Sequence, residues 1–170
     1  MKVLVVHEIS YRNSPVFEFQ EFSEGFQVAG HQVLVVDLKD KPKAGNSGGS
    51  TESGIRLQPM RSREGQIRVW TPLFGAPRDF LRPMAVISHA VTLLFAFLWF
   101  RPSVVFSYSV PTSGPSVAVL GRIFRVPVVH RSIDVSHLLR PGIFSPVVRL
   151  AEKLTFRLSD YTSTHNRALA

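Results

Sequence analysis

The chain has 170 residues and a hydrophobic content of 45%, which is enough for one domain with a buried core and excludes a disordered chain. It contains no cysteine, which excludes disulfides, thiolate catalysis and cysteine-ligated metals and agrees with a reducing cytoplasm. Its 20 Lys and Arg residues outnumber its 12 Asp and Glu residues, and the net charge of +8 favours an acidic partner such as nucleic acid, anionic lipid or a phosphorylated ligand.

The N-terminal part of the sequence predicts a β-α-β unit. Residues Lys2–Val6 form an apolar run, which is typical of a strand covered on both faces. Ser14 and Pro15 have the pattern of an N-cap and a first-turn proline, with Glu18 roughly where a capping box places its acidic residue, and Gly30 predicts the end of that helix. Residues Gln32–Leu38 predict the second strand.

Residues 39–65 carry Gly, Ser, Pro and charged residues with little apolar content, and they predict a flexible insertion. Most of the arginines of the first half of the chain fall in or just after this segment: Arg56, Arg61, Arg63, Arg68, Arg78 and Arg82. They form neither a basic run nor a pattern interleaved with aromatics, so we expect no nucleic-acid partner. A solvated basic loop and a functional basic surface both fit this arrangement.

Residues 66–71 predict a third strand, and the apolar run Met84–Phe100 predicts a long helix. Seventeen residues are at the lower limit for crossing a bilayer. Because a strand follows directly after Arg101 and Pro102, we expect a helix that packs on the sheet or rests at an interface rather than one that spans a membrane. Its apolar end near the arginines suits an anionic lipid surface.

The C-terminal part alternates strands and helices. Residues 103–109, 128–133 and 161–164 predict strands, and residues 116–124 and 145–159 predict helices. Strands that alternate with helices of this length indicate βαβ units. The fold class is therefore predicted to be α/β, a Rossmann-like doubly wound parallel sheet, with the strand order 3-2-1-4-5-6 that is usual for it.

Ligands of such sheets bind beyond the carboxyl ends of the strands, and the first and fourth strands are neighbours there. Carboxylates, hydroxyls and imidazoles follow these ends, so the crevice suits a hydroxylated ligand or proton abstraction from it. The candidate residues are Glu8, Ser10, Tyr108, Ser113, Arg131, Asp134 and His137. Structural roles remain open for the histidines, and a turn or N-cap role remains open for Asp134.

Several common sites lack their motifs in this sequence. No glycine follows the first strand directly, as a dinucleotide site requires, and no Gly-Lys-Ser/Thr phosphate loop occurs. The histidines and carboxylates of the candidate loops have no metal-ligand spacing. We therefore expect neither a bound dinucleotide nor a metal site.

The order of motifs resembles the N-terminal domain of retaining glycosyltransferases of the large family-4 type, which have the two-domain GT-B fold. The family's Gly-His-x-Val element matches Gly30–Val33, its Arg-Pro-Asp-Val-Val element matches Arg101–Val105, and its x-Pro-Val-Val element matches Arg125–Val129. The sequence departs from the family where two glycines usually follow the first strand. In the family a His-Asp pair usually follows the fifth strand. Here Ile133 occupies the position of the histidine, and Asp134 matches the aspartate.

The resemblance implies that residues 1–170 form the acceptor-binding half of a retaining glycosyltransferase, inactive alone. A C-terminal domain carrying a Glu-x7-Glu element, in cis or in trans and absent from this sequence, would bind a UDP- or GDP-sugar, and no resident cofactor is implied. Asp134 and His137 are then the expected catalytic residues, and the expected acceptor-binding residues are Glu8, Ser10, Tyr108, Ser113 and Arg131.

The resemblance also suggests an acceptor that is lipid-linked or a cell envelope polysaccharide. We expect a cytoplasmic protein that is peripheral at the inner face of the membrane. The alternatives are a non-enzymatic Rossmann-like binding module and a small flavodoxin-like or hydrolase enzyme. The missing phosphate loop and the missing Gly-x-Ser-x-Gly elbow count against the last of these.

Overall fold

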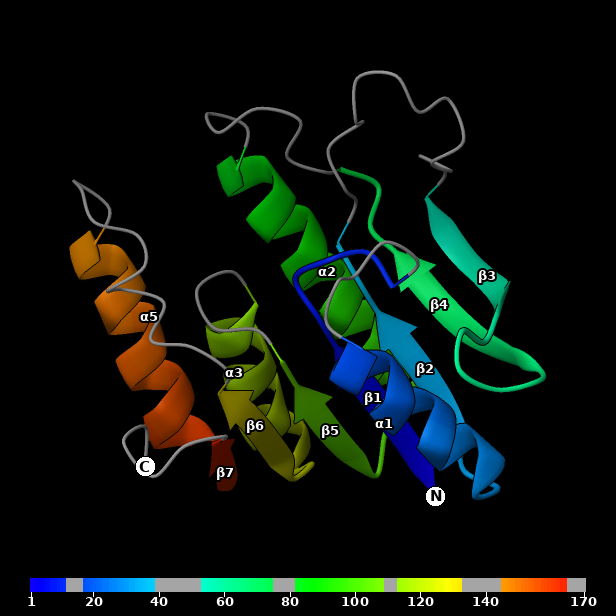
Figure 1. Ribbon diagram of the computed structural model, residues 1–170. Helices are drawn as coiled ribbons and strands as arrows, with labels where there is room; N and C mark the ends of the chain where they lie inside the picture. Colours follow the sequence, from blue (N-terminus) through cyan, green and yellow to red (C-terminus); the bar gives the residue numbers. More distant parts are fainter. Residues whose placement is uncertain (12–16, 39–52, 75–81, 109–112, 133–144, 165–170) are drawn as a thin grey trace.

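The computed structural model describes residues 1–11, 17–38, 53–74, 82–108, 113–132 and 145–164 (Figure 1). The strands are β1 (Lys2–Val6), β2 (Gln32–Val36), β3 (Gly54–Pro59), β4 (Gln66–Thr71), β5 (Val104–Ser107), β6 (Val128–Ser132) and β7 (Tyr161–Thr164). The helices are α1 (Phe17–Val28), α2 (Arg82–Phe100), α3 (Gly114–Phe124) and α5 (Ser145–Leu158). The predicted strands and helices are confirmed, and β2 and β5 are shorter than predicted.

The strands form one sheet in the order β3-β4-β2-β1-β5-β6-β7 (Figure 1). All neighbouring pairs are parallel except β3 and β4, which are antiparallel. Without β3 this is the predicted order of a doubly wound sheet, so the fold class is confirmed as Rossmann-like α/β. The chain reverses its direction of winding between β1 and β5, which places a crevice at the carboxyl ends of these two strands.

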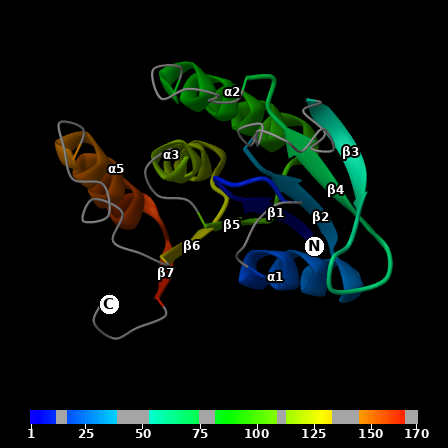
Figure 2. The ribbon, with the colours of Figure 1, turned by 45° about the horizontal axis from the view of Figure 1, so that its top comes forward.

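Helix α1 covers one face of the sheet, and α2, α3 and α5 lie on the other face (Figure 2). Alternate residues of β1 divide between the two cores. Val3 and Val5 pack with Phe19 of α1, whereas Leu4 and Val6 pack in the core that contains Leu93, Phe97 and Phe100 of α2. Strand β1 is therefore buried on both faces, as its apolar run predicted.

Gly30 ends α1 as predicted. It has a φ of 83°, and the N–H of the following residue, His31, donates to the carbonyl of Phe26 at 3.0 Å. This is the left-handed helix end that glycine adopts without steric cost. Ser14 lies outside the described residues, so the predicted capping box is not tested, and Glu18 has a different partner that is described below.

The prediction of a flexible insertion over residues 39–65 is wrong for residues 54–59. These residues form β3, which pairs with β4 from Gly54 opposite Thr71 to Pro59 opposite Gln66. The loop between the two strands is fixed by the buried carboxylate of Glu24, which accepts the N–H groups of Arg61 and Ser62 at 2.7 and 2.8 Å. Backbone pairing and one distant acceptor stabilise this hairpin, and neither depends on apolar content.

Candidate functional site

The carboxyl ends of β1, β5 and β6 lie side by side, as the predicted strand order required. Val6 pairs with Ser107, and Ser107 pairs with His130 on the next strand. Past the strand ends, His7 donates its N–H to the last carbonyl of β2 at 3.0 Å, and Tyr108 donates its N–H to the carbonyl of Val6 at 2.9 Å. The residues that follow these strands thus emerge at one edge of the sheet, the carboxyl edge.

Arg131, near the end of β6, is held by residues from two other elements. Its Nε and Nη2 atoms lie 2.9 Å from Oε1 of Glu18 on α1, and its Nη1 donates to Oγ of Ser163 on β7 at 2.5 Å. The side chains of Arg131 and Glu18 are only 19% and 21% exposed. Because bonds between ionised groups in this geometry are strong and directional, the three residues form a rigid unit, which we call the Arg131 cluster.

Aromatic rings lie next to the Arg131 cluster on the same face of the sheet. His7 stacks on Phe19 with ring centroids 4.2 Å apart, and Tyr108 meets Phe19 edge-on at 5.9 Å. Burial raises the pKa of Tyr108, the charge of Glu18 raises it further, and the charge of Arg131 opposes both. Its hydroxyl is therefore a neutral hydrogen-bond donor at physiological pH.

His7 shapes the start of the loop after β1. Burial lowers the pKa of His7 to about 4, so the ring is neutral at physiological pH. The N–H of Ile9 donates to its Nδ1 at 3.0 Å, and we infer from this bond that the proton of the ring is on Nε2. His7 is thus fixed by stacking on one side and by the loop backbone on the other.

The same loop is anchored by Asp37, which follows β2 and is buried. Asp37 accepts the N–H of Tyr11 at 2.8 Å and the hydroxyl of Thr71 at 2.7 Å. The carbonyl of Tyr11 accepts a hydrogen bond from Gln20, and its hydroxyl donates to Glu24 at 2.5 Å. Bonds at three points of Tyr11 hold this loop, which lacks the glycines that the resemblance led us to look for.

The structure brings some of the predicted site residues to the carboxyl edge. Tyr108 and Arg131 lie close enough to interact electrostatically, and Glu8 and Ser10 are partly exposed in the loop after β1. Ser113 is buried at the start of α3, where its carbonyl accepts the N–H of Val117 at 2.9 Å and its hydroxyl does not cap the helix.

The two predicted catalytic residues, Asp134 and His137, lie outside the described residues. Over the part of the chain that the structure describes, no group of three or more His, Asp or Glu side chains could hold a metal ion.

Sequence reasoning missed Glu18, Ser163 and Asp37. Glu18 was interpreted as a capping residue, but it is the partner of Arg131. A signal existed, because Val128 of β6 packs in the core on the α2 side and Arg131, three residues later, therefore points to the other face, toward α1. Glu18 is in the first turn of α1, the end nearest the carboxyl edge. Asp37 directly follows a buried strand, a position that could have been included among the candidates.

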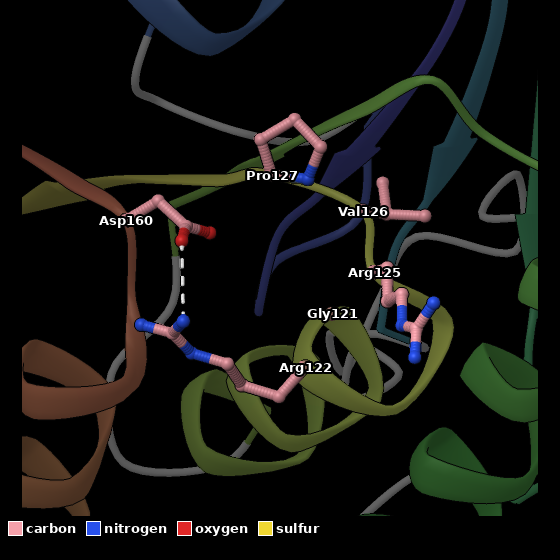
Figure 3. Close-up of a pocket in the computed structure, with 6 residues that line it drawn as sticks. All are labelled: Gly121, Arg122, Arg125, Val126, Pro127 and Asp160. Carbon is pink, nitrogen blue, oxygen red and sulfur yellow. Dashed lines mark ion pairs between the residues drawn. The ribbon is translucent and has the colours of Figure 1, made fainter.

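A hollow of about 310 Å³ lies at the opposite edge of the sheet (Figure 3). Its lining residues come from α3 and from the segments that lead into β6 and β7: Gly121, Arg122, Arg125, Val126, Pro127 and Asp160. Because ligands of such sheets bind at the carboxyl ends of the strands, this place is not the expected one for the reaction.

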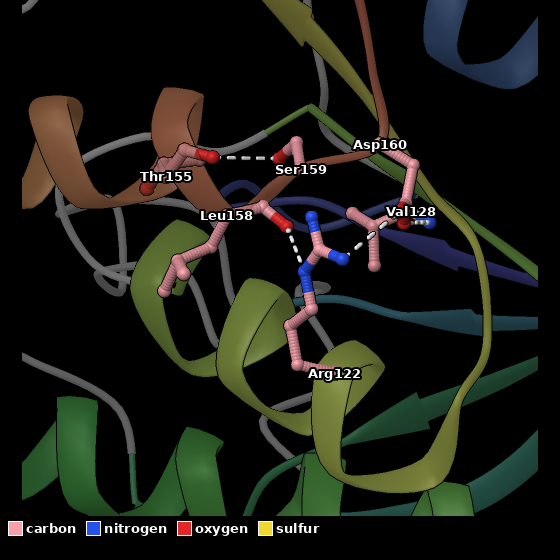
Figure 4. Close-up of polar contacts among 6 residues, drawn as sticks. All are labelled: Arg122, Val128, Thr155, Leu158, Ser159 and Asp160. Atoms are coloured by element: carbon pink, nitrogen blue, oxygen red, sulfur yellow. Dashed lines mark hydrogen bonds and ion pairs between the residues drawn. The ribbon is translucent and has the colours of Figure 1, made fainter.

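Polar contacts at the same place show a structural role (Figure 4). Arg122 donates from Nε to the carbonyl of Leu158 at 3.1 Å and lies 3.6 Å from Asp160, which also accepts the N–H of Val128 at 2.9 Å. These bonds connect α3, the end of α5 and the start of β6. The lining carboxylate and one of the two arginines are therefore used to join elements.

Comparisons with known proteins agree with this architecture. Residues 17–170 match a family described as a glycosyl transferase 4-like domain. The fold is similar to that of a UDP-GlcNAc 2-epimerase from Methanocaldococcus jannaschii, with a TM-score of 0.59, 10% identity and coverage of 98% of this chain and 40% of the other. A putative UDP-N-acetylglucosamine 2-epimerase from Listeria monocytogenes gives a TM-score of 0.62, 7% identity and coverage of 98% and 39%.

MurG from Acinetobacter baumannii gives a TM-score of 0.50, 10% identity and coverage of 96% of this chain and 40% of the other. No curated protein sequence matches the chain. Identities this low establish a shared fold and nothing about the reaction. The chain spans about 40% of the length of the solved structures that it matches.

Proposed function

Because this chain belongs to the glycosyl transferase 4-like domain family, we propose that it is the acceptor-binding half of a retaining glycosyltransferase. The complete enzyme uses a UDP- or GDP-sugar that a second Rossmann-like domain, in cis or in trans, presents across the carboxyl edge. The reaction needs no resident metal ion. The acceptor is a lipid-linked or polysaccharide intermediate.

The observation that carries this proposal is the Arg131 cluster beside Tyr108. Such a site suits a sugar, because aromatic rings pack against the apolar face of the sugar while polar groups bond its hydroxyls. Here the ring is that of Phe19, and the polar groups are the neutral hydroxyl of Tyr108 and the ion pair of Arg131 with Glu18. They lie where β1 and β5 end, which is the expected ligand position of this fold.

In the proposed reaction this half orients the acceptor and supplies no covalent chemistry of its own. Arg131 stays in one position because Glu18 and Ser163 hold it, so little side-chain entropy is lost when an acceptor binds. Tyr108 donates to an acceptor hydroxyl. Asp134 and His137 remain the proposed catalytic residues, with Asp134 orienting the hydroxyl that attacks.

The test is sugar transfer from UDP- and GDP-sugars to a membrane lipid extract and to a polysaccharide fraction, by the protein together with its second Rossmann-like domain, whether this is in cis or a separate chain. Arg131→Lys keeps the charge but cannot make the same fork of bonds. We expect it to raise the acceptor KM and to lower kcat/KM on the order of tenfold to a hundredfold. Arg63→Lys, on the exposed hairpin loop, is the matched control and should change neither constant.

Two results would contradict the proposal. If Arg131→Lys changes kcat and KM no more than Arg63→Lys does, the Arg131 cluster is structural only. If the protein together with a second Rossmann-like domain, in cis or supplied as a separate chain, transfers sugar from neither donor to either fraction, the alternative of a non-enzymatic binding module takes its place.

A further inference from the structure

Helix α2 is apolar on most of its circumference, and its polar residues after Arg82 are Ser88, His89 and Thr92. No charged residue occurs between Pro83 and Phe100, and this segment is long and apolar enough to cross a membrane, judged by length and composition alone. Only 39% of it is buried in the protein. Large apolar side chains lie exposed along one side of the helix: Met84, Ile87, Val91, Leu94, Phe95 and Leu98. A helix that is apolar on most sides needs an apolar environment on those sides.

The inner side of α2 shows that the helix does not cross a bilayer. Leu93, Phe97 and Phe100 are at most 5% exposed and belong to the core that contains Leu4 and Leu34 of the sheet. A spanning helix would have to leave this core and expose it. If α2 stays on the sheet and its outer side contacts the apolar layer of a membrane, both sides of the helix are removed from water. In this arrangement the helix lies flat on the membrane surface.

The C-terminal end of α2 carries the residue types that favour a lipid–water boundary. Trp99 is 55% exposed, its ring meets Trp70 edge-on at 6.1 Å, and the guanidinium of Arg68 lies 5.9 Å from its centroid. The exposed residue Arg101 follows. An indole beside arginines has an apolar body and a polar rim, which suits the level of lipid head groups.

The other end of α2 extends the apolar surface to the carboxyl edge of the sheet. Leu73 and Phe74, which follow β4, are 72% and 57% exposed, and the N–H of Phe74 donates to Oγ of Ser88 on α2 at 3.2 Å. The apolar surface therefore reaches the carboxyl edge of the sheet, although the Arg131 cluster lies on the other face of the sheet at that edge.

Helices α3 and α5, on the same face of the sheet, add positive charge to the surface (Figure 2). In their described residues every exposed charged side chain is basic: Arg122, Arg149, Lys153 and Arg157. The carboxylate of Glu152 on α5 is buried. Exposed apolar residues, including Ile123 and Leu150, lie between these charges. Helix α1, on the opposite face, carries three glutamates and no basic residue.

We propose that the outward face of α2, α3 and α5 docks on a bilayer that contains anionic lipid, with α2 flat on the surface and α1 turned away from it. The positive charge of this face favours a membrane over a second copy of the chain as its partner. A second copy of a chain with a net charge of +8 would bring like charges together on this face, whereas anionic head groups neutralise them. The proposal concerns a surface outside the candidate site, and vesicle binding tests it whether or not transfer is detected.

The experiment is sedimentation of the full-length protein with phosphatidylcholine vesicles, with and without phosphatidylglycerol, at low and at high salt. Binding should require phosphatidylglycerol and weaken at high salt. Replacing Ile87, Leu94 and Leu98 by Ser should weaken binding by at least about tenfold. The control is Phe22→Ser with Val28→Ser, which removes exposed apolar residues from α1 and should bind like the unaltered protein.

A charge variant separates this surface from the arginines of the hairpin. Arg149→Gln with Lys153→Gln should weaken binding by about thirtyfold, because each basic residue near an anionic surface contributes about fivefold. Arg56→Gln with Arg63→Gln removes equal charge from the hairpin and should have a smaller effect.

The variants remove exposed side chains, so circular dichroism should report an unchanged fold. No binding to anionic vesicles at low salt, or equal loss with the hairpin variant, overturns the proposal. So does a dimer of the unaltered protein that the α2 variant dissociates, since the occupant would then be a second copy.

Discussion

Helix α1 meets the sheet with both polar and apolar side chains, whereas α2, on the opposite face, meets it almost entirely with apolar ones. On α1, Glu18 pairs with Arg131, and the buried Glu24 accepts hydrogen bonds from Tyr11 and from the loop between β3 and β4. On α2, Leu93 and Phe97 belong to a hydrophobic core, and the outer side of the helix is apolar as well.

The difference assigns different tasks to the two faces. Directional bonds of α1 fix the positions of loops and of Arg131 at the carboxyl edge, which is what a binding site for a polar ligand needs. The apolar contacts of α2 fix no single polar group, but they hold a long helix with its outer side free for an apolar partner. Four variants, each with a control or a reference, test this contrast and are given in order of decreasing effect on stability at pH 7.

The largest effect is expected for the inner side of α2. Leu93 is fully buried, and Leu93→Ala should lower the free energy of unfolding by about 2–5 kcal/mol, because it removes buried surface and leaves a cavity. Its neighbour Leu94 is 39% exposed, and Leu94→Ala should change the value by about 0.5 kcal/mol or less. Urea denaturation measures both. If both substitutions lower the free energy of unfolding equally, the side of α2 that carries Leu93 does not face the sheet.

The next effect concerns the polar contacts of α1. Glu24→Ala leaves the hydroxyl of Tyr11 and the N–H groups of Arg61 and Ser62 without their acceptor, and we expect a loss of about 3 kcal/mol. Hydrogen exchange at the amides of Arg61 and Ser62 should accelerate. Glu21→Ala, an exposed glutamate on the same helix, is the control and should change stability and exchange little. Unchanged exchange in Glu24→Ala would show that the hairpin is held by β4 alone.

Glycines give the third contrast. A Cβ on Gly121 of α3 would lie 2.3 Å from Cγ2 of Val128 and 3.0 Å from the carbonyl oxygen of Val126, so Gly121→Ala should cost about 1–3 kcal/mol of stability. Gly25, within α1, has open space at the same position, and Gly25→Ala should stabilise by about 0.5–1 kcal/mol. Thermal unfolding of the two variants should therefore shift in opposite directions. Two shifts of the same sign would contradict the close contact of α3 with β6.

Much of the fold could be predicted from the sequence because its signals are local. The apolar runs of β1 and β2, the glycine after α1 and the regular alternation of strands and helices after Arg101 each depend on neighbouring residues. Strand β3 was missed for the opposite reason. Its stability comes from pairing with β4 and from Glu24, which is 37 residues away from Arg61. The alternation of Ile55 and Leu57 with Arg56 and Gln58 is typical of a strand, but it is too short to predict either contact.

The candidate site was predictable in position and only partly in composition. The rule that ligands bind at carboxyl ends of strands led to Tyr108 and Arg131. Their environment depends on residues more than eighty positions earlier, since Glu18 reaches Arg131 across the sheet edge and Phe19 meets Tyr108. A carboxylate in the first turn of a helix has several possible partners, and the sequence alone does not select among them.

The smallest effect at pH 7 is expected for the one histidine of α2, because its replacement changes stability only at lower pH. His89 is fully buried, and within the described residues neither of its ring nitrogens has a hydrogen-bond partner. Burial lowers its pKa to about 4 from an ordinary value of 6.5. Above pH 6.5 the ring is neutral in both states and stability does not depend on it.

Between pH 6.5 and about 4 the unfolded chain binds a proton at His89 that the folded chain does not bind, so the free energy of unfolding falls by about 1.4 kcal/mol for each pH unit. His7 and His130 have similarly lowered pKa values, so the effect of His89 must be isolated by substitution. His89→Leu should unfold with a shallower pH dependence than the unaltered protein in this range and should be no less stable at pH 7. If both proteins lose stability at the same rate below pH 6.5, His89 is not buried in a dry core, and the contrast between the polar contacts of α1 and the apolar contacts of α2 fails at this position.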